Sequence, residues 1–285
     1  MSQVVSSDSR GGNSRRCLEV FLDYLAHQPA VLVRVDAFEG SVPREKGAWM
    51  AVFKGTLVGT IGGGHLEFDA QAQAQAMLKS GVNSGAAQTV RFALGPSLGQ
   101  CCGGVVYLRF EYVGAYDIAA LRIGLQPALL PVALFGGGHV GHALVQVLAA
   151  LPFAVTWIDS RDGVFSQTLS PGVECEHSQP VQAAVRSLAP QSRVLIMSFS
   201  HAEDLDVLSA CLQRQRELAD LPYIGLIGSK TKWATFRHRL EARGFRADEL
   251  AHVTSPIGVP GIIGKEPEVI AIAVAAQLLQ DVKEQ

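Results

Sequence analysis

The sequence predicts an α/β protein: a Rossmann-like C-terminal domain with a mainly parallel sheet, preceded by a smaller α+β N-terminal domain. The chain of 285 residues is long enough for two domains. From residue 131 onward, apolar strand-like runs alternate with helical patterns, which is typical of a parallel sheet covered on both faces. A glycine-rich stretch, Gly136 to Gly141, joins the first of these strands to the first helix.

Residues 17–113 are expected to form the N-terminal α+β domain, after a disordered polar leader at 1–16. Spacing of apolar residues, proline and glycine predicts, in order, helix 17–28, strand 30–38, a hairpin of strands 49–53 and 57–61, a glycine loop and helix over 62–80, and strands 89–94 and 105–113.

Residues 114–130 are expected to be a linker, and residues 131–285 the Rossmann-like domain. Its predicted elements are strand 131–135, a helix to about 151, strand 154–158 ending in Asp159, strand 193–197, a helix from about 202, strand 223–227, helix 229–243 and helix 266–282. Ser229 and Gly244 are residue types that favour the two ends of a helix.

Composition excludes several classes of function. Hydrophobic residues make up 48% of the chain, which is enough for a large core. The 24 basic and 26 acidic residues give a net charge of −2, so no overall positive field attracts nucleic acid or an anionic membrane. Residues 1–16 lack the apolar segment of a signal peptide, and no apolar run is long enough to span a bilayer. We therefore expect a cytoplasmic protein with no nucleic-acid or membrane partner.

The first motif is a G-x-G-x-x-G pattern made by Gly136, Gly138 and Gly141. Glycines allow a phosphate to approach the backbone, and the following helix offers free N–H groups. Asp159 ends the second strand, where a ribose-binding acid is expected, although Arg161 could instead accept a 2′-phosphate. The pattern therefore predicts a dinucleotide site, or glycines that only permit close packing of strand and helix.

A second glycine run, Gly62, Gly63 and Gly64, precedes His65 and Glu67. Its N–H groups could bind an anion at the start of a helix, and the alternative is a tight turn with Glu67 favourably placed in the first helical turn.

Cys101 and Cys102 are flanked by glycines and precede a strand. Such thiols suit a nucleophile or a soft-metal ligand, and the alternative is that they pack as small apolar residues. The five cysteines form no disulfide framework, and the other three are expected to be structural: Cys17, Cys175 and Cys211.

Three further stretches follow predicted strands of the second half. His201 and Asp204 stand where open α/β sheets bind ligands, although acids in a first helical turn explain Asp204 equally well. Lys230 and Lys232 begin a basic helix whose N-terminus could bind a phosphate, although we expect a solvated charged face. Residues 260–267 are expected to form a lid or the rim of a ligand crevice.

Together these stretches resemble the XdhC/CoxI family, the xanthine dehydrogenase accessory proteins. The resemblance covers about residues 17–281 and rests on six stretches in a specific order: 40–44 (GSVPR), 59–67 (GTIGGGHLE), 98–104 (LGQCCGG), 135–141 (FGGGHVG), 223–230 (YIGLIGSK) and 255–267 (SPIGVPGIIGKEP). One position departs from the family pattern, since Phe199 stands where the family often has a histidine.

The resemblance implies a chaperone rather than an enzyme. Such proteins bind the molybdenum cofactor (molybdopterin), hold it during sulfuration and aid its insertion into xanthine dehydrogenase, an enzyme of purine metabolism. The implied partners are xanthine dehydrogenase, a cysteine desulfurase, molybdenum cofactor biosynthesis proteins and a second copy in a homodimer. Cys101 and Cys102 would contact molybdenum, and the other expected cofactor-binding residues are Gly62, Gly63, Gly64, His65, Glu67, Gly136, Gly138, Gly141 and Asp159.

Two other functions remain open on the residues alone. The Gly136–Gly141 motif with Asp159 also fits an NAD(P)-dependent oxidoreductase. Cys101 and Cys102 also fit a thiol-redox or sulfur-carrier protein, an activity that the chaperone role can include.

Overall fold

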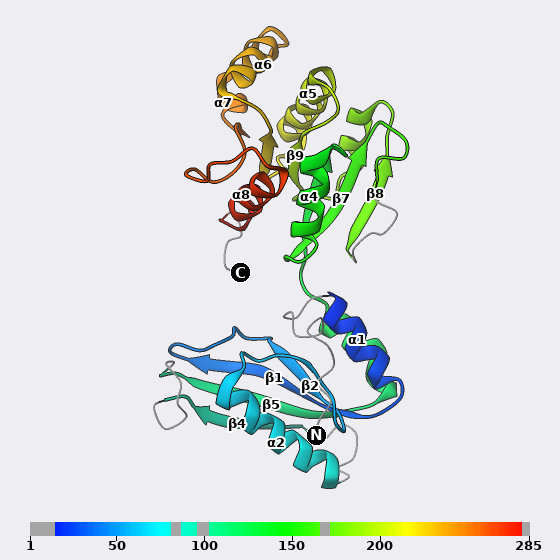
Figure 1. The fold of residues 1–285 in the computed structure, drawn as a ribbon, viewed down its shortest axis with the longest axis vertical. Coiled ribbons are helices and arrows are strands. Elements are labelled where there is room, and N and C mark those ends of the chain that lie inside the picture. The colour runs from blue at the N-terminus through cyan, green and yellow to red at the C-terminus, as the bar shows by residue number, and fades with distance from the viewer. Residues whose placement is uncertain (1–14, 81–86, 96–102, 166–171, 281–285) are drawn as a thin grey trace. The chain divides into compact units, whose positions relative to one another are not determined.

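The structure of the protein, a computed structural model, describes residues 15–80, 87–95, 103–165 and 172–280 (Figure 1). The chain divides into two compact units, Met1–Pro127 and Ala128–Gln285. The first contains an antiparallel sheet with helices and the second a parallel sheet with helices, which confirms the predicted fold class. Within the described residues, no helix is both long enough and apolar enough to cross a bilayer.

The first unit is a five-stranded antiparallel sheet with one helix on one face and two helices on the other. The strand order is β3-β2-β1-β5-β4, so the long strands β1 and β5 lie at its centre. Its elements are α1 (Arg15–Leu25), β1 (Ala30–Glu39), β2 (Trp49–Val52), β3 (Leu57–Gly59), α2 (Gly64–Ser80), β4 (Ala87–Ala93), β5 (Val105–Val113), a 3-10 turn (Ala115–Asp117) and α3 (Ile118–Gly124).

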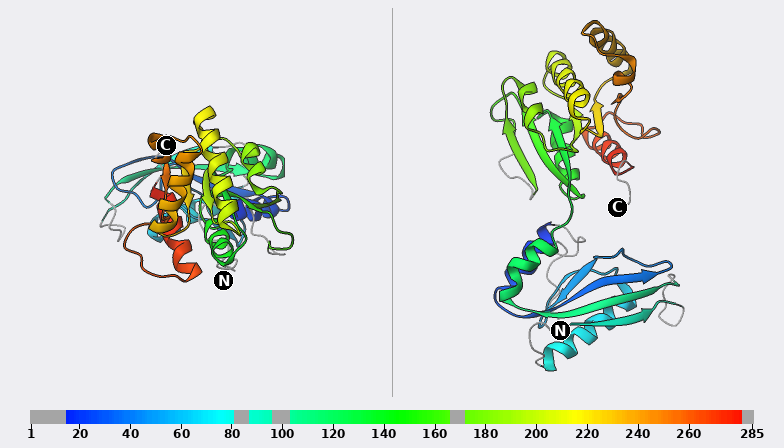
Figure 2. Two further views of the ribbon diagram at one scale, coloured as in Figure 1. Left: turned by 90° about the horizontal axis from the view of Figure 1, so that it is seen from above. Right: turned by 180° about the vertical axis from the view of Figure 1, so that it is seen from behind.

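Alternation along the strands directs apolar side chains to both faces of this sheet. Val31, Val33 and Val35 pack with Leu66 and Ala70 of α2 on one face. On the other face, Leu32 and Trp49 pack with residues of α1 and with Leu125, which follows α3. Figure 2 shows α1 and α3, blue and green, side by side in the right-hand view.

The second unit is a six-stranded parallel sheet in the order β11-β10-β9-β6-β7-β8. The order grows outward from β6 in both directions, which is the doubly wound arrangement. Its elements are β6 (Leu130–Phe135), α4 (His139–Leu148), β7 (Phe153–Asp159), β8 (Val173–His177), a 3-10 segment (Val181–Ser187), β9 (Arg193–Ile196), α5 (His201–Leu218), β10 (Tyr223–Leu226), α6 (Lys230–Ala242), α7 (Ala247–Leu250), β11 (Val253–Thr254) and α8 (Pro267–Gln280).

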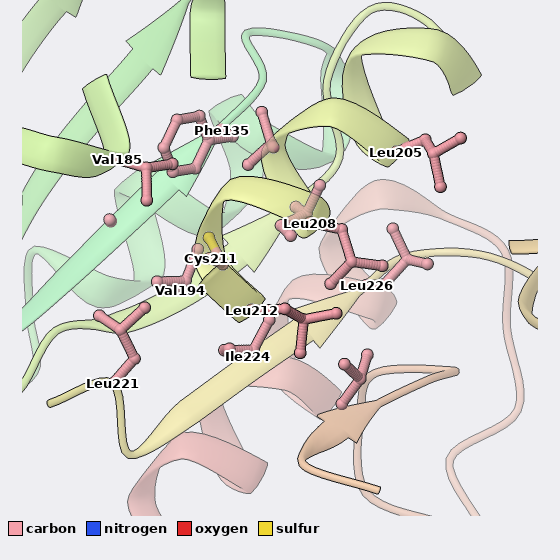
Figure 3. Packing of buried hydrophobic residues seen from close by; sticks show 14 of the residues in the cluster. Phe135, Val185, Val194, Leu205, Leu208, Cys211, Leu212, Leu221, Ile224 and Leu226 are labelled. Atoms are coloured by element: carbon pink, nitrogen blue, oxygen red, sulfur yellow. The ribbon is translucent and has the colours of Figure 1, made fainter. Parts of the chain in front are cut away.

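Two apolar layers cover the parallel sheet. Helices α4 and α8 pack on one face, over Leu134 and Trp157. The other face is covered by the 3-10 segment, α5 and α6, where Phe135, Ile224 and Leu226 belong to one buried cluster with Leu208 and Leu212 of α5 (Figure 3). Cys211 lies inside this layer, and burial raises the pKa of its thiol to about 12, as expected for a structural cysteine.

Several local expectations differ from the structure. Residues 114–130, expected as a linker, contain a 3-10 turn and α3, and Leu125 is buried. Strand β8 was not predicted from the sequence. Cys175, expected to be structural, is exposed on β8, whereas Cys17 is buried in the first unit and its thiol pKa is raised to about 11 by burial.

Candidate functional site

The loops at the carboxyl ends of the parallel strands form the candidate site of the second unit. Strand order reverses between β6 and β9, and open α/β sheets bind ligands at such a switch point. The loop after β6 carries the predicted glycines, and the loop after β9 carries Ser198, Phe199 and Ser200.

The turn between β6 and α4 requires its glycines. Gly136 has a φ of 129°, and a Cβ there would lie 2.0 Å from the carbonyl oxygen of Met197. A Cβ on Gly141 would lie 2.1 Å from the carbonyl oxygen of Gly136. Gly138, in contrast, is exposed with open space where a Cβ would be, and His139 beside it is exposed. The start of α4 at Gly138 and His139 is therefore exposed, and the first N–H groups of a helix have no partner within the helix.

Asp159, at the end of β7, holds this turn in place. Its buried carboxylate accepts a hydrogen bond from the Gly137 N–H at 2.6 Å and three more from Arg161, through the backbone N–H, Nε and Nη2, each at 2.9 Å. Burial raises the pKa of Asp159, but the hydrogen bonds from Arg161 and Gly137 outweigh it and hold that pKa below its usual value. Four bonds fill the acceptor capacity of a carboxylate, so little remains for a ribose hydroxyl.

Arg161 and Phe199 form a stacked pair at the same edge. The guanidinium carbon of Arg161 lies 4.5 Å from the centroid of the Phe199 ring. Asp159 fixes the orientation of the guanidinium through the two side-chain hydrogen bonds. The Phe199 residue nevertheless remains 67% exposed, so this pair presents a planar surface to solvent.

A buried ion pair fastens α5 to α6 behind the loop after β9. Lys232 Nζ lies 2.6 Å from Asp204 Oδ2 and also donates to the carbonyl oxygen of Ile227. The other oxygen of Asp204 accepts hydrogen bonds from the backbone N–H and hydroxyl of Ser198. The expectation of a solvated basic face is therefore wrong for Lys232, whose side chain is only 11% exposed, and it holds for Lys230.

The first turn of α5 contributes a second carboxylate. Ser200 caps the helix by accepting a hydrogen bond from the Glu203 N–H. Glu203 Oε1 accepts a 2.5 Å hydrogen bond from the Ser160 hydroxyl, which ties α5 to the loop after β7. Glu203 Oε2 is buried and has no hydrogen-bond partner among the described residues. His201 is exposed, and its ring lies against Phe236.

The loop after β11 leaves the carboxyl end of a parallel strand and contains residues 260–267, whose expected role as a lid or rim stays a prediction. Gln277 of α8 anchors its beginning, because Gln277 Oε1 accepts hydrogen bonds from the Gly258 N–H and the Tyr223 hydroxyl, both at 2.7 Å. Farther along, Ile262 is partly exposed and Ile263 is 95% exposed. The loop thus has a fixed base and an apolar end that contacts solvent.

In the first unit, the run Gly62, Gly63 and Gly64 forms a turn that a carboxylate already occupies. All three residues have positive φ, between 67° and 119°, which explains why three glycines follow one another. Glu67 Oε2 accepts hydrogen bonds from the N–H groups of Ile61 and Gly63, both at 3.1 Å, and from the Thr60 hydroxyl at 2.6 Å. These donors serve the turn itself, while His65 is exposed.

Three separate stretches of the first unit meet around residues 40–44. The Gly104 N–H donates to the carbonyl oxygen of Ser41, and a Cβ on Gly104 would lie 2.5 Å from that oxygen. A Cβ on Gly62 would lie 2.4 Å from Cβ of Pro43. The order of these stretches in the sequence gave no sign that they pack together, and their small residues are what allows it.

The predicted site residues fall into separate groups. Gly136, Gly138, Gly141 and Asp159 lie together in the second unit, and the run from Gly62 to Glu67 lies in the first. Cys101 and Cys102 lie outside the described residues, so their role stays a prediction. Among the described residues, no three His, Cys, Asp or Glu side chains are grouped as metal ligands. Arg161 was considered only as an acceptor of a 2′-phosphate, and Glu203 and Lys232 were not predicted as site residues.

Comparison with known proteins gives two family matches. The XdhC Rossmann domain matches residues 132–278, and the XdhC and CoxI family matches residues 24–93. A curated relative is the uncharacterized protein YqeB of Escherichia coli (strain K12), 26% identical over 258 residues that make up 88% of this chain. The matched region is 43% of YqeB, so this chain spans less than half of that protein.

Two solved structures also resemble this chain. A xanthine dehydrogenase from Bacillus halodurans is 23% identical with a TM-score of 0.72, covering 93% of this chain and 95% of that one, which shows a shared fold. A Rossmann-fold NAD(P)-binding family protein from Shigella flexneri is 15% identical with a TM-score of 0.35, covering 52% of this chain and 85% of that one. Because the Rossmann-domain match extends over half of the sequence, the chain belongs to the XdhC and CoxI family.

Proposed function

We propose that this chain is a molybdenum cofactor chaperone: it binds molybdopterin, holds it during sulfuration and aids its insertion into xanthine dehydrogenase. The observation that carries this proposal is membership of the XdhC and CoxI family, with matches in both units. In this role the chain binds and transfers a cargo without turning over a substrate.

The residues at the carboxyl edge of the parallel sheet fit the chemistry of this cargo. Molybdopterin carries a phosphate, a pterin ring with hydrogen-bonding edges and a dithiolene that binds the metal. N–H groups at the exposed start of α4, beyond Gly138, suit the phosphate. The planar surface of Arg161 and Phe199 suits a flat ring, and the unpartnered oxygen of Glu203 suits a ring N–H.

Thiolates are the side chains that suit molybdenum and sulfur transfer. Cys101 and Cys102 are the residues that we propose for this role, because soft ligands bind soft metal centres. A cysteine desulfurase as sulfur donor, the enzymes of cofactor biosynthesis as suppliers and a homodimer as the working state are further parts of the proposal. The cytoplasm is the compartment in which reduced thiols would persist.

The test is anaerobic co-elution of the full chain with released molybdenum cofactor. After desalting, the protein fraction is assayed for molybdenum by mass spectrometry and for the fluorescent oxidised pterin. We expect near-stoichiometric amounts of both, and loss of molybdenum in the Cys101→Ala/Cys102→Ala variant. An empty protein fraction from the unaltered chain would exclude the cofactor as its cargo.

An NAD(P)-dependent oxidoreductase is the second candidate function, because the turn after β6 has the geometry of a dinucleotide-binding loop. The engagement of all four acceptor sites of Asp159 within the protein weighs against it. A parallel co-elution with NADPH separates the two. Retention of NADPH by a fraction that holds no pterin would favour the oxidoreductase.

A further inference from the structure

We propose that Phe199, Arg161 and Glu203 recognise one chemical feature: a planar ring whose edge carries two adjacent N–H donors. The 2-amino-4-oxopyrimidine edge of a pterin is such a ring, and the guanine of a nucleotide shares it. For the pterin, this inference rests on the function proposed above and adds the residues that select the cargo.

The stacking surface is preorganised. Arg161 is held by the buried Asp159 through Nε and Nη2, and its guanidinium carbon lies 4.5 Å from the Phe199 ring centroid. A side chain fixed in this way loses little conformational freedom when a ring binds. Phe199 remains two-thirds exposed at the switch point of the sheet, where a ligand of this fold is expected.

Glu203 differs from the other acids at this edge. Both oxygens of Asp159 accept hydrogen bonds, and both oxygens of Asp204 do as well. Glu203 uses Oε1 for the Ser160 hydroxyl, whereas Oε2 is buried without a donor among the described residues. A buried acceptor without a partner is unfavourable, so a ligand N–H that reaches it gains a charge-assisted hydrogen bond.

Glu203 belongs to the same cluster as the stacking pair. Its partner Ser160 is the chain neighbour of both Asp159 and Arg161, and its negative charge acts on the Arg161 guanidinium. Phe199 lies in the loop that leads into the helix bearing Glu203. The aromatic ring, the cation and the carboxylate are thus linked through residues 159–161 and 199–203 at one edge of the sheet.

The donor pattern of the ring decides between ligand classes. Two parallel N–H bonds from neighbouring ring and amino groups would use Glu203 Oε2 together with the second lone pair of Oε1, which also accepts the Ser160 hydroxyl. Pterin and guanine offer this pair, whereas the exocyclic amino group of adenine adjoins ring nitrogens that only accept. The site therefore favours pterin and guanine over adenine nucleotides.

The experiment is a binding titration of the full chain with 6-hydroxymethylpterin, GMP and AMP, followed by fluorescence anisotropy or calorimetry. We expect pterin to bind at least about 10-fold more tightly than AMP, and Phe199→Ala and Glu203→Gln each to weaken pterin binding by about 10-fold. Phe199→Trp should retain it. GMP binding as tight as pterin binding would identify the shared edge, rather than the pterin ring, as the recognised feature.

Matched controls separate recognition from general damage. Tyr116→Ala removes an exposed aromatic ring from the first unit, and Glu217→Gln neutralises an exposed acid farther along α5. Both should bind pterin as the unaltered chain does. Unchanged pterin binding in Phe199→Ala and Glu203→Gln, AMP binding as tight as pterin binding, or no pterin binding by the unaltered chain would overturn this inference. Cofactor retention in the co-elution assay judges the chaperone role separately.

Discussion

At the scale of single residues, two glycines of the turn after β6 should differ in how much their substitution by alanine lowers the free energy of unfolding. Gly136→Ala places a Cβ against the Met197 carbonyl oxygen at a φ that disfavours side chains, so we expect a loss of about 3–5 kcal/mol in unfolding free energy. Gly138→Ala meets open space at a φ of −82° and should cost less than about 1 kcal/mol. Urea unfolding measures both. Equal losses would show that the turn is not built as described.

The carboxylate of Asp159 should make the free energy of unfolding depend on pH in the acid range. Its pKa is lowered in the folded protein, so its contribution is present above the unfolded pKa of about 3.9 and disappears as the pH falls through the folded value. Asp159→Asn should lower the unfolding free energy at pH 7 by about 2–4 kcal/mol, since it leaves Arg161 and Gly137 without a carboxylate. Urea unfolding at pH 7, 5 and 3.5 checks this. The difference from the unaltered chain should shrink only below about pH 4.

Residue roles were predictable where the backbone itself demanded a residue type. The glycines at 62–64, Gly136 and Gly141 were identified from sequence because backbone geometry or close packing requires them, whereas Gly138 has no such requirement. The partners of Asp159 and Glu67 were not, since each depends on which N–H groups the folded turn brings to a carboxylate. Lys232 was misjudged because a lysine on a polar helix looks the same in sequence whether or not a buried acid faces it.

At the scale of elements, the ion pair between Asp204 and Lys232 is expected to hold α6 against α5. Lys232→Met leaves the buried Asp204 without its cation and should cost about 3–5 kcal/mol. Adding Asp204→Asn should recover part of that loss, because no buried charge remains. Chemical denaturation of the single and double variants gives the coupling energy.

Lys230→Met is the control for this pair, since Lys230 is exposed at the start of the same helix. It should change stability by less than about 0.5 kcal/mol. A Lys232→Met variant as stable as the Lys230→Met variant would show that the buried pair does not fasten the helices.

Long helices with a clear period and the hairpin around Lys54 and Gly55 were predicted, whereas several other short or edge elements were not. The hairpin of β2 and β3 and the helices α5, α6 and α8 occur close to their expected places. Strand β8 was missed because its central residues Glu174, Cys175 and Glu176 give an edge strand little apolar pattern. The short helix α3 was missed because its 7 residues make only about two helical turns, too few to show a helical period of apolar residues.

At the scale of the whole molecule, each unit has its own apolar core. The layers around β1 and β5 belong to the first unit, and those around β6 and β9 belong to the second. A chain of residues 128–285 should therefore fold alone. Circular dichroism should show a cooperative thermal transition, which Gly136→Ala shifts downward. A separate 128–285 chain without any cooperative transition would show that the second unit depends on the first.

The division into two units also explains the limits of sequence reasoning about the site. The parallel sheet and its carboxyl edge follow from alternating strands and helices, which made the Gly136–Gly141 turn identifiable. The grouping of residues 40–44 with Gly62 and Gly104 depends on how an antiparallel sheet closes, and spacing in the sequence does not encode it.

The location of cargo binding is tested most directly by backbone amide NMR of the full chain during addition of 6-hydroxymethylpterin. If the carboxyl edge of the parallel sheet is the site, the largest shifts will fall on Gly137 to Val140, Ser160 and Arg161, and Phe199 to Glu203. Phe199→Ala will remove these shifts. Shifts confined to the first unit, or none at saturating pterin, would place binding elsewhere and refute this site.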